Sequence, residues 1–167
     1  PGFPRPGFPS MGSWATFGLG HDNQNLPGFV VLSAGQPPYG GRLNWTSGFL
    51  PANHQGVAFR TNSTEPVPDL RTPDGTTADA RTADMKLLAA MNSDFASTNS
   101  GDTAFAARLR SYELAARMQM SIPEATNLAD ESETTQRMYG IDEPTNKGFA
   151  RNCLTARRLL ERGVRFV

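Results

Sequence analysis

Proline and glycine are distributed very unevenly along this 167-residue chain. Residues 1–80 hold 11 of the 13 prolines and 12 of the 16 glycines, which leaves 2 prolines and 4 glycines for residues 81–167. Proline lacks the N–H that a helix needs, and both residue types favour turns. The sequence therefore predicts a first half built from loops and short elements, followed by a mostly helical second half.

The charge balance and the residue content exclude several classes of protein. The chain carries 16 basic and 16 acidic side chains, so it lacks the overall positive charge that attracts nucleic acid or an anionic membrane. A single cysteine cannot form an internal disulfide or a multi-thiolate zinc site. No apolar run approaches the roughly 18–20 residues of a membrane span. We therefore expect neither a nucleic-acid partner nor a membrane span.

The first half contains two clear patterns. Residues 11–19 predict a short helix that Ser10 opens and Gly20 closes. The continuous apolar run at residues 28–33 predicts a buried strand. The remaining segments predict a turn-rich loop at 35–41, an irregular stretch with one helical turn after Leu50 at 42–60, and an exposed excursion at 61–82.

The second half predicts four helices, at residues 82–97, 102–120, 130–139 and 146–162, with a new turn starting at 122–124. Apolar side chains at helical spacing are expected to face the core. They are Met85, Leu88, Met91 and Phe95 in the first helix, Phe105, Leu109, Tyr112, Ala116 and Met120 in the second, and Phe149, Cys153, Ala156, Leu159 and Leu160 in the last.

The end of the last helix predicts an α/β connection. Gly163 is expected to stop the helix, and residues 164–167 form an alternating apolar run typical of a strand. A helix that leads through a glycine into a strand is the return leg of an α/β unit, so its partner strands are expected to be parallel. Arg151, Arg157, Arg158 and Arg162, with Glu161, are interpreted as an exposed helix face.

Ser10 is the main candidate for chemistry. A serine directly before a helix lies beside the unpaired N–H groups of the first turn, which form a natural anion site. Its hydroxyl would be placed to attack a phosphate or sulfate bound there, although it needs a base or a metal for activation. The simpler interpretation is an ordinary N-cap, a position that serine favours. Arg42 is likewise either an anion contact from the loop after the strand or a solvated side chain.

Several segments resemble one family. They are residues 9–20, 23–32 (NQNLPGFVVL), 45–51 (WTSGFLP), 112–119 (YELAARMQ) and 149–167 (FARNCLTARRLLERGVRFV). The chain resembles an uncharacterised sulfatase-like bacterial family, a domain of unknown function, in the alkaline phosphatase superfamily. Gly18 and Gly20 also follow Ser10 at the offsets seen after the nucleophilic serine in the cofactor-independent phosphoglycerate mutases of that superfamily.

The resemblance implies the fold class and the domain organisation. We expect an α/β protein: residues 1–167 would be an internal fragment of one alkaline-phosphatase-like three-layer sandwich. Residues 1–81 would supply the nucleophile loop, a helix, a strand and the excursion, and residues 82–167 a helical segment that leads into a strand. The family's aspartate and histidine motifs lie beyond this segment, and His21 and His54 are interpreted as surface or loop residues.

The resemblance also implies an activity. The natural protein would be a metal-dependent hydrolase of phosphate or sulfate esters, acting on a small-molecule or glycan ester. Ser10 would be the nucleophile and a ligand of two divalent metal ions, zinc or similar, and Ser13 and Arg42 would bind substrate. The fragment itself would be inactive, and the protein would be periplasmic or exported.

Two alternatives stay open. The chain could belong to a catalytically degenerate member of the same fold that acts as an exported binding or scaffold protein. The helical half, residues 82–163, could also be an interaction insert whose role is independent of Ser10.

Overall fold

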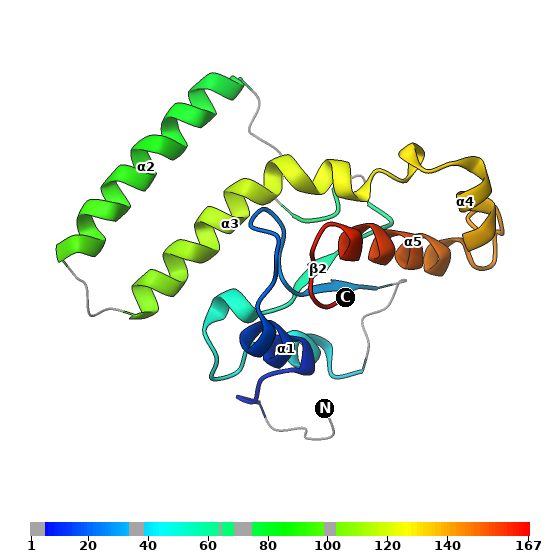
Figure 1. Ribbon diagram of the computed structural model, residues 1–167, viewed down its shortest axis with the longest axis horizontal. Helices are drawn as coiled ribbons and strands as arrows, with labels where there is room; N and C mark the ends of the chain where they lie inside the picture. Colours follow the sequence, from blue (N-terminus) through cyan, green and yellow to red (C-terminus); the bar gives the residue numbers. More distant parts are fainter. Residues whose placement is uncertain (1–5, 34–38, 64, 69–74, 99–102) are drawn as a thin grey trace.

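The computed structural model describes residues 6–33, 39–63, 65–68, 75–98 and 103–167. Figure 1 shows a long helical pair, α2 (Ala78–Thr98) and α3 (Thr103–Thr126), that extends away from a body containing the remaining elements. Part of the loop predicted at 35–41 and part of the excursion predicted at 61–82 lie outside the described residues.

The first half follows the predicted pattern closely. Helix α1 runs over Met11–Leu19 between Ser10 and Gly20, as expected, and strand β1 is Val30–Leu32. The helical turn after Leu50 is the 3-10 turn η2 (Ala52–His54). A second 3-10 turn, η1 (Gly41–Trp45), and strand β2 (Val57–Phe59) occupy a stretch that the sequence predicted to be irregular.

A small parallel sheet joins the two ends of the chain. Strands β1 and β2 pair in parallel, with Val30 opposite Val57. On the other side of the same segment, Phe29 forms a parallel bridge with Phe166, which confirms the predicted parallel return of the C-terminal segment. The described part of the chain is thus helix-rich with a two-stranded parallel sheet, an arrangement compatible with the α/β class. The three-layer sandwich stays a prediction.

Three further elements complete the second half: η3 (Leu128–Asp130), α4 (Glu133–Tyr139) and α5 (Lys147–Glu161). Gly140 ends α4 with a positive φ of 76°, and Gly163, at a φ of 84°, follows α5 as predicted. The break expected at residues 122–124 was wrong, because α3 continues through Pro123 to Thr126. Ile122 and Ala125 are both fully buried, and their packing holds the helix together across the proline. Within the described ranges, no helix has the length and apolar content to cross a bilayer.

The core lies where α3 and α5 meet the sheet. Its buried side chains are Leu26, Val30, Phe59, Met118, Ile122, Ala125, Leu159 and Val164. A second, smaller cluster joins α4, α5 and η3 through Leu128, Ile141, Ala150 and Leu154, with Tyr139 at its edge. The elements of the two halves therefore share one main core.

The predicted core faces of the long helices were largely wrong. In α3, Tyr112 and Met120 are 68% and 83% exposed, whereas Met118 is buried. In α5, Leu159 is fully buried as predicted, but Phe149 and Leu160 are more than half exposed, and the other buried positions are Ala150, Asn152, Leu154, Thr155 and Arg158. In α2, Leu88, Met91 and Phe95 are exposed as well. Apolar residues occupy several faces of these helices, so their spacing alone does not identify the face that packs.

The expectation that Arg158 lies on an exposed face was also wrong. Its side chain is only 6% exposed, and its Nη1 lies 2.5 Å from Oε1 of Glu131. Arg157 reaches the other carboxylate oxygen at 2.6 Å. Hydrogen bonds from Arg158 and Arg157 hold the pKa of Glu131 below its usual value. This carboxylate is therefore charged and paired in the folded protein.

The core assignment on α3 can be tested with two neighbouring residues. Ile122→Ala is expected to lower the free energy of unfolding by about 2–5 kcal/mol, because it opens a cavity in the core. Met120→Ala, at a position that is 83% exposed, is expected to change it by no more than about 0.5 kcal/mol. Urea unfolding followed by circular dichroism measures both. Equal losses would contradict the observed orientation of α3.

The Glu131 pair makes stability depend on pH. Because the folded-state pKa of Glu131 is lowered, its contribution is present above the unfolded pKa and is lost as the pH falls through the folded value. The wild-type melting temperature should therefore fall on acidification from pH 7 to 3. Glu131→Gln should lower the melting temperature at pH 7 and flatten that fall. Glu143→Gln, an exposed control, should retain the wild-type melting temperature at pH 7. A full acid dependence in Glu131→Gln would contradict this assignment.

Candidate functional site

Ser10 lies at the predicted place, immediately before α1, but its hydroxyl does not cap the helix. Its backbone is extended (φ −72°, ψ 165°), and the side chain makes no hydrogen bond to a first-turn amide. Oγ of Ser10 lies 2.9 Å from Oγ of Ser13, which in turn donates to the carbonyl oxygen of Thr46 at 3.0 Å. The N–H of Ser10 donates to the same carbonyl, also at 3.0 Å. The two serines thus tie the start of α1 to the segment after η1.

This pair of hydroxyls is buried. Ser10 is 1% exposed and Ser13 is 0% exposed. Gly48 explains part of the covering, since a Cβ at that position would lie 2.4 Å from the carbonyl carbon of Phe8. The backbone around Gly48 therefore packs directly on the chain just before Ser10. A substrate cannot reach the Ser10 oxygen while these segments stay in contact.

Arg42, the other predicted substrate contact, is not brought to the serines. It lies in η1 and is exposed. Among the described residues, no hydrogen bond or ion pair joins it to Ser10 or Ser13. Within the described ranges, the structure therefore joins Ser10 to Ser13 by a hydrogen bond and joins Arg42 to neither.

The donors around Ser10 do not fit a pair of divalent metal ions. They are neutral hydroxyl and carbonyl oxygens, whereas such ions need carboxylates or imidazoles. His21 uses its Nδ1 at 2.6 Å from the carbonyl oxygen of Asn23. His54 packs edge-on against Phe17, and burial, followed by the charges of His21 and Arg110, lowers its pKa. Across the described ranges, no three His, Cys, Asp or Glu side chains gather as a metal site.

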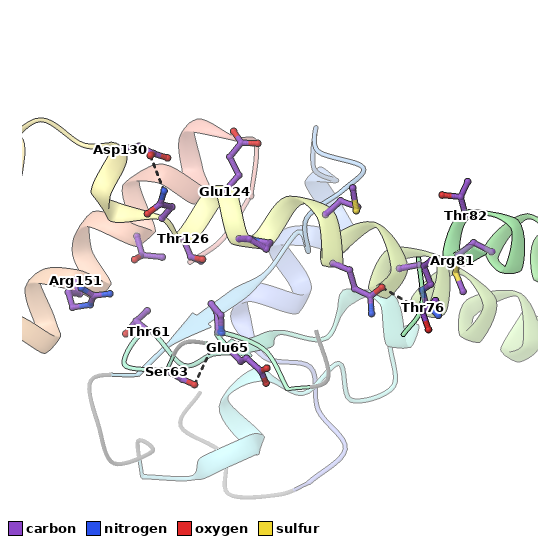
Figure 2. A pocket seen from close by; sticks show the side chains of 18 of the residues that line it. Thr61, Ser63, Glu65, Thr76, Arg81, Thr82, Glu124, Thr126, Asp130 and Arg151 are labelled. Carbon is purple, nitrogen blue, oxygen red and sulfur yellow. Dashed lines mark hydrogen bonds between the residues drawn. The ribbon is translucent and has the colours of Figure 1, made fainter. Parts of the chain in front are cut away.

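A large groove lies elsewhere, between the segment at residues 61–66, α2, the second half of α3 and α5 (Figure 2). Its volume is about 1340 Å³, and Ser10 is not among its lining residues. The sequence does not reveal this groove, because four separate segments line it, each with ordinary polar side chains. The one available signal was the run of threonines and serines at residues 61–82, which was interpreted only as an exposed excursion.

The close packing at the start of α1 gives a testable contrast between two glycines of that helix. A Cβ on Gly12 would lie 2.6 Å from the ring of Phe29, so Gly12→Ala should cost about 1–3 kcal/mol of stability. Gly18 has nothing within 4 Å of the equivalent position, so Gly18→Ala should stabilise the helix by up to about 1 kcal/mol. Thermal unfolding distinguishes them, and equal effects would contradict the packing of Phe29 on α1.

Comparison with known proteins places the chain in a family without assigning it an activity. No curated protein and no solved structure matches it. One family model, described as "Protein of unknown function (DUF1501)", matches residues 1–167. The chain therefore belongs to the DUF1501 family.

Proposed function

We propose that this chain belongs to a catalytically degenerate member of the alkaline-phosphatase-like fold, which acts as an exported binding or scaffold protein. The observation that carries this proposal is the environment of Ser10. Ser10 as a whole residue is 1% exposed, and its Oγ is hydrogen-bonded to Ser13. A nucleophile must meet its substrate, and this hydroxyl serves instead as an internal link between α1 and the segment around Thr46.

Adding further chain to this arrangement would not expose the oxygen. Any segment that packs on a rigid body can only cover more of its surface. Exposure of Ser10 would require the hydrogen bonds to the Thr46 carbonyl to break and the backbone at Gly48 to leave its contact with Phe8. These contacts support a structural role for Ser10, with binding carried out elsewhere on the molecule.

Hydrolysis of phosphate or sulfate esters is the second candidate function. The observation that favours it is the position of Ser10 directly before the nine-residue helix α1, where first-turn N–H groups stabilise anions. In this alternative Ser10 would be the nucleophile and a metal ligand, with Ser13 and Arg42 as substrate contacts. It requires the segment around Gly48 to open and carboxylate or imidazole ligands to come from outside the described residues.

An assay of ester hydrolysis with the natural protein distinguishes the two candidate functions. With aryl phosphate and aryl sulfate substrates and added Zn²⁺, the binding function predicts no turnover above background in the wild type or in Ser10→Ala. Ser10→Ala should still cost about 1 kcal/mol of stability through its lost hydrogen bond.

The control is Met11→Ala, next to Ser10 but 70% exposed, which should unfold like the wild type. Metal-dependent turnover that Ser10→Ala abolishes and Met11→Ala retains would overturn the binding proposal in favour of hydrolysis.

A further inference from the structure

Helix α1 has its small polar side buried and its aromatic side exposed. Its buried residues are Gly12, Ser13 and Thr16. Trp14 and Phe17 lie on the other side of the helix and are 47% and 50% exposed. A helix at the surface of a protein usually has the reverse arrangement, with its large apolar side chains facing the core. A contiguous apolar surface that is left exposed in this way is typical of an interaction site.

Two further rings extend this surface into a continuous patch. The ring centre of Phe49 lies 5.7 Å from that of Trp14 and 6.3 Å from that of Phe8. The ring centre of Phe17 lies 6.1 Å from that of Trp14. We call these four residues, Phe8, Trp14, Phe17 and Phe49, the aromatic patch. Figure 1 shows α1, which carries two of them, at the lower edge of the body.

The area of the aromatic patch is close to what a stable dimer needs. Its four residues are between 47% and 64% exposed. At about 200 Å² for each fully accessible side chain of this size, they expose roughly 450 Å². A homodimer interface of standard size buries about 800 Å² on each partner, of which about two thirds is apolar. The four rings alone therefore supply most of the apolar area of such an interface.

The surface around the aromatic patch carries no formal charge. Residues 6–20 and 43–53, the two segments that form it, contain no Asp, Glu, Lys or Arg. Burial holds the pKa of His54, which packs against Phe17, below its usual value, so this imidazole is neutral at pH 7. In a twofold dimer the same surface of both copies meets, and any charge near the axis faces its own equivalent. An uncharged patch avoids this repulsion and is therefore suited to a second copy of the chain.

The geometry of the aromatic patch is less suited to two other partners. Neighbouring rings are inclined to each other by 74° to 79°, so they do not form the flat platform on which sugar rings stack. Helices that lie in a membrane interface are rich in Lys and Arg on their polar face, and α1 has neither residue. The nearest described cations, Arg108 and Arg110, line a separate groove beside Phe49.

We propose that the aromatic patch joins two copies of this chain in a homodimer, with α1 of one copy against α1 of the other around a twofold axis. The inference goes beyond the proposed function, because it assigns a partner to the side of α1 that does not include the Ser10 hydroxyl. It holds whether or not Ser10 takes part in ester hydrolysis, and its test measures association and not activity.

Sedimentation equilibrium of the natural protein, at about 1 to 100 µM, tests the proposal, and the wild type is expected to dimerise within this range. Gly18→Lys places a charge four residues after Trp14, on the same side of α1, where nothing lies within 4 Å. Lysine suits the last turn of a helix better than glycine does, so the monomer should stay folded. The dimer should weaken at least about tenfold through repulsion between the two lysines, and Trp14→Ala should weaken it as much.

Gly148→Lys is the matched control. Gly148 is also a helical glycine with nothing within 4 Å of its Cβ position, but it lies in α5, outside the aromatic patch. This variant should dimerise like the wild type. Circular dichroism confirms that each variant is folded, and co-sedimentation with vesicles of phosphatidylcholine and phosphatidylserine measures binding to lipid.

A wild-type protein that stays monomeric over this concentration range would overturn the proposal. A dimer that Gly18→Lys and Trp14→Ala leave intact, or that Gly148→Lys weakens equally, would also overturn it. Binding of the monomer to vesicles that is lost in Trp14→Ala would assign the aromatic patch to a lipid surface instead. Failure of the proposed function is distinguishable from all of these results, because it appears as Ser10-dependent ester hydrolysis.

Discussion

The buried guanidinium of Arg158 is the interaction that ties together the helices of the second half of the chain. From α5 it donates to the carbonyl oxygens of Ala125 (3.1 Å) and Glu124 (3.0 Å), at the end of α3, and to Glu131 beyond η3. The last carbonyls of a helix have no partner within it, and this one side chain donates to two of them, of which the Glu124 carbonyl also accepts from the N–H of Asn127. The same contacts fix α3 against α5 beside Ile122 and Leu159, and the core forms around that junction.

Local chemistry allowed the boundaries of several elements to be predicted. Ser10 and Gly20 enclose α1, and Gly163 follows α5, because backbone preferences at those positions act within a few residues. The buried faces of the helices were not predictable in this way. Arg158 and Thr155 are buried while Phe149 and Leu160 are exposed, a pattern that depends on partners far away in sequence. Strand β2 escaped prediction because three residues carry too little periodicity.

The position of Ser10 in the fold was predictable from the sequence, but its surroundings were not. The sequence correctly places Ser10 before a helix, yet it contains no signal for the approach of Gly48 or for the bond from Ser13 to Thr46. For the groove, neither the position nor the surroundings of its residues could be predicted from the sequence. Its side chains come from residues 61–66, α2, α3 and α5, and only the tertiary arrangement brings Arg81 and Arg151 to one surface. A constellation of this kind has no fixed spacing, so no motif reveals it.

The parallel bridge between Phe29 and Phe166 has a consequence for biosynthesis. Val30 donates to the carbonyl oxygen of Phe166, and Arg165 and Phe166 both donate to the carbonyl of Gly28. Residues 28–30 are therefore synthesised more than a hundred residues before the C-terminal residues that pair with them. Contacts of such long sequence separation slow folding, and β1 would remain exposed on that edge during translation. The edge of β1 that Phe166 covers is therefore among the last parts of this fold to be paired.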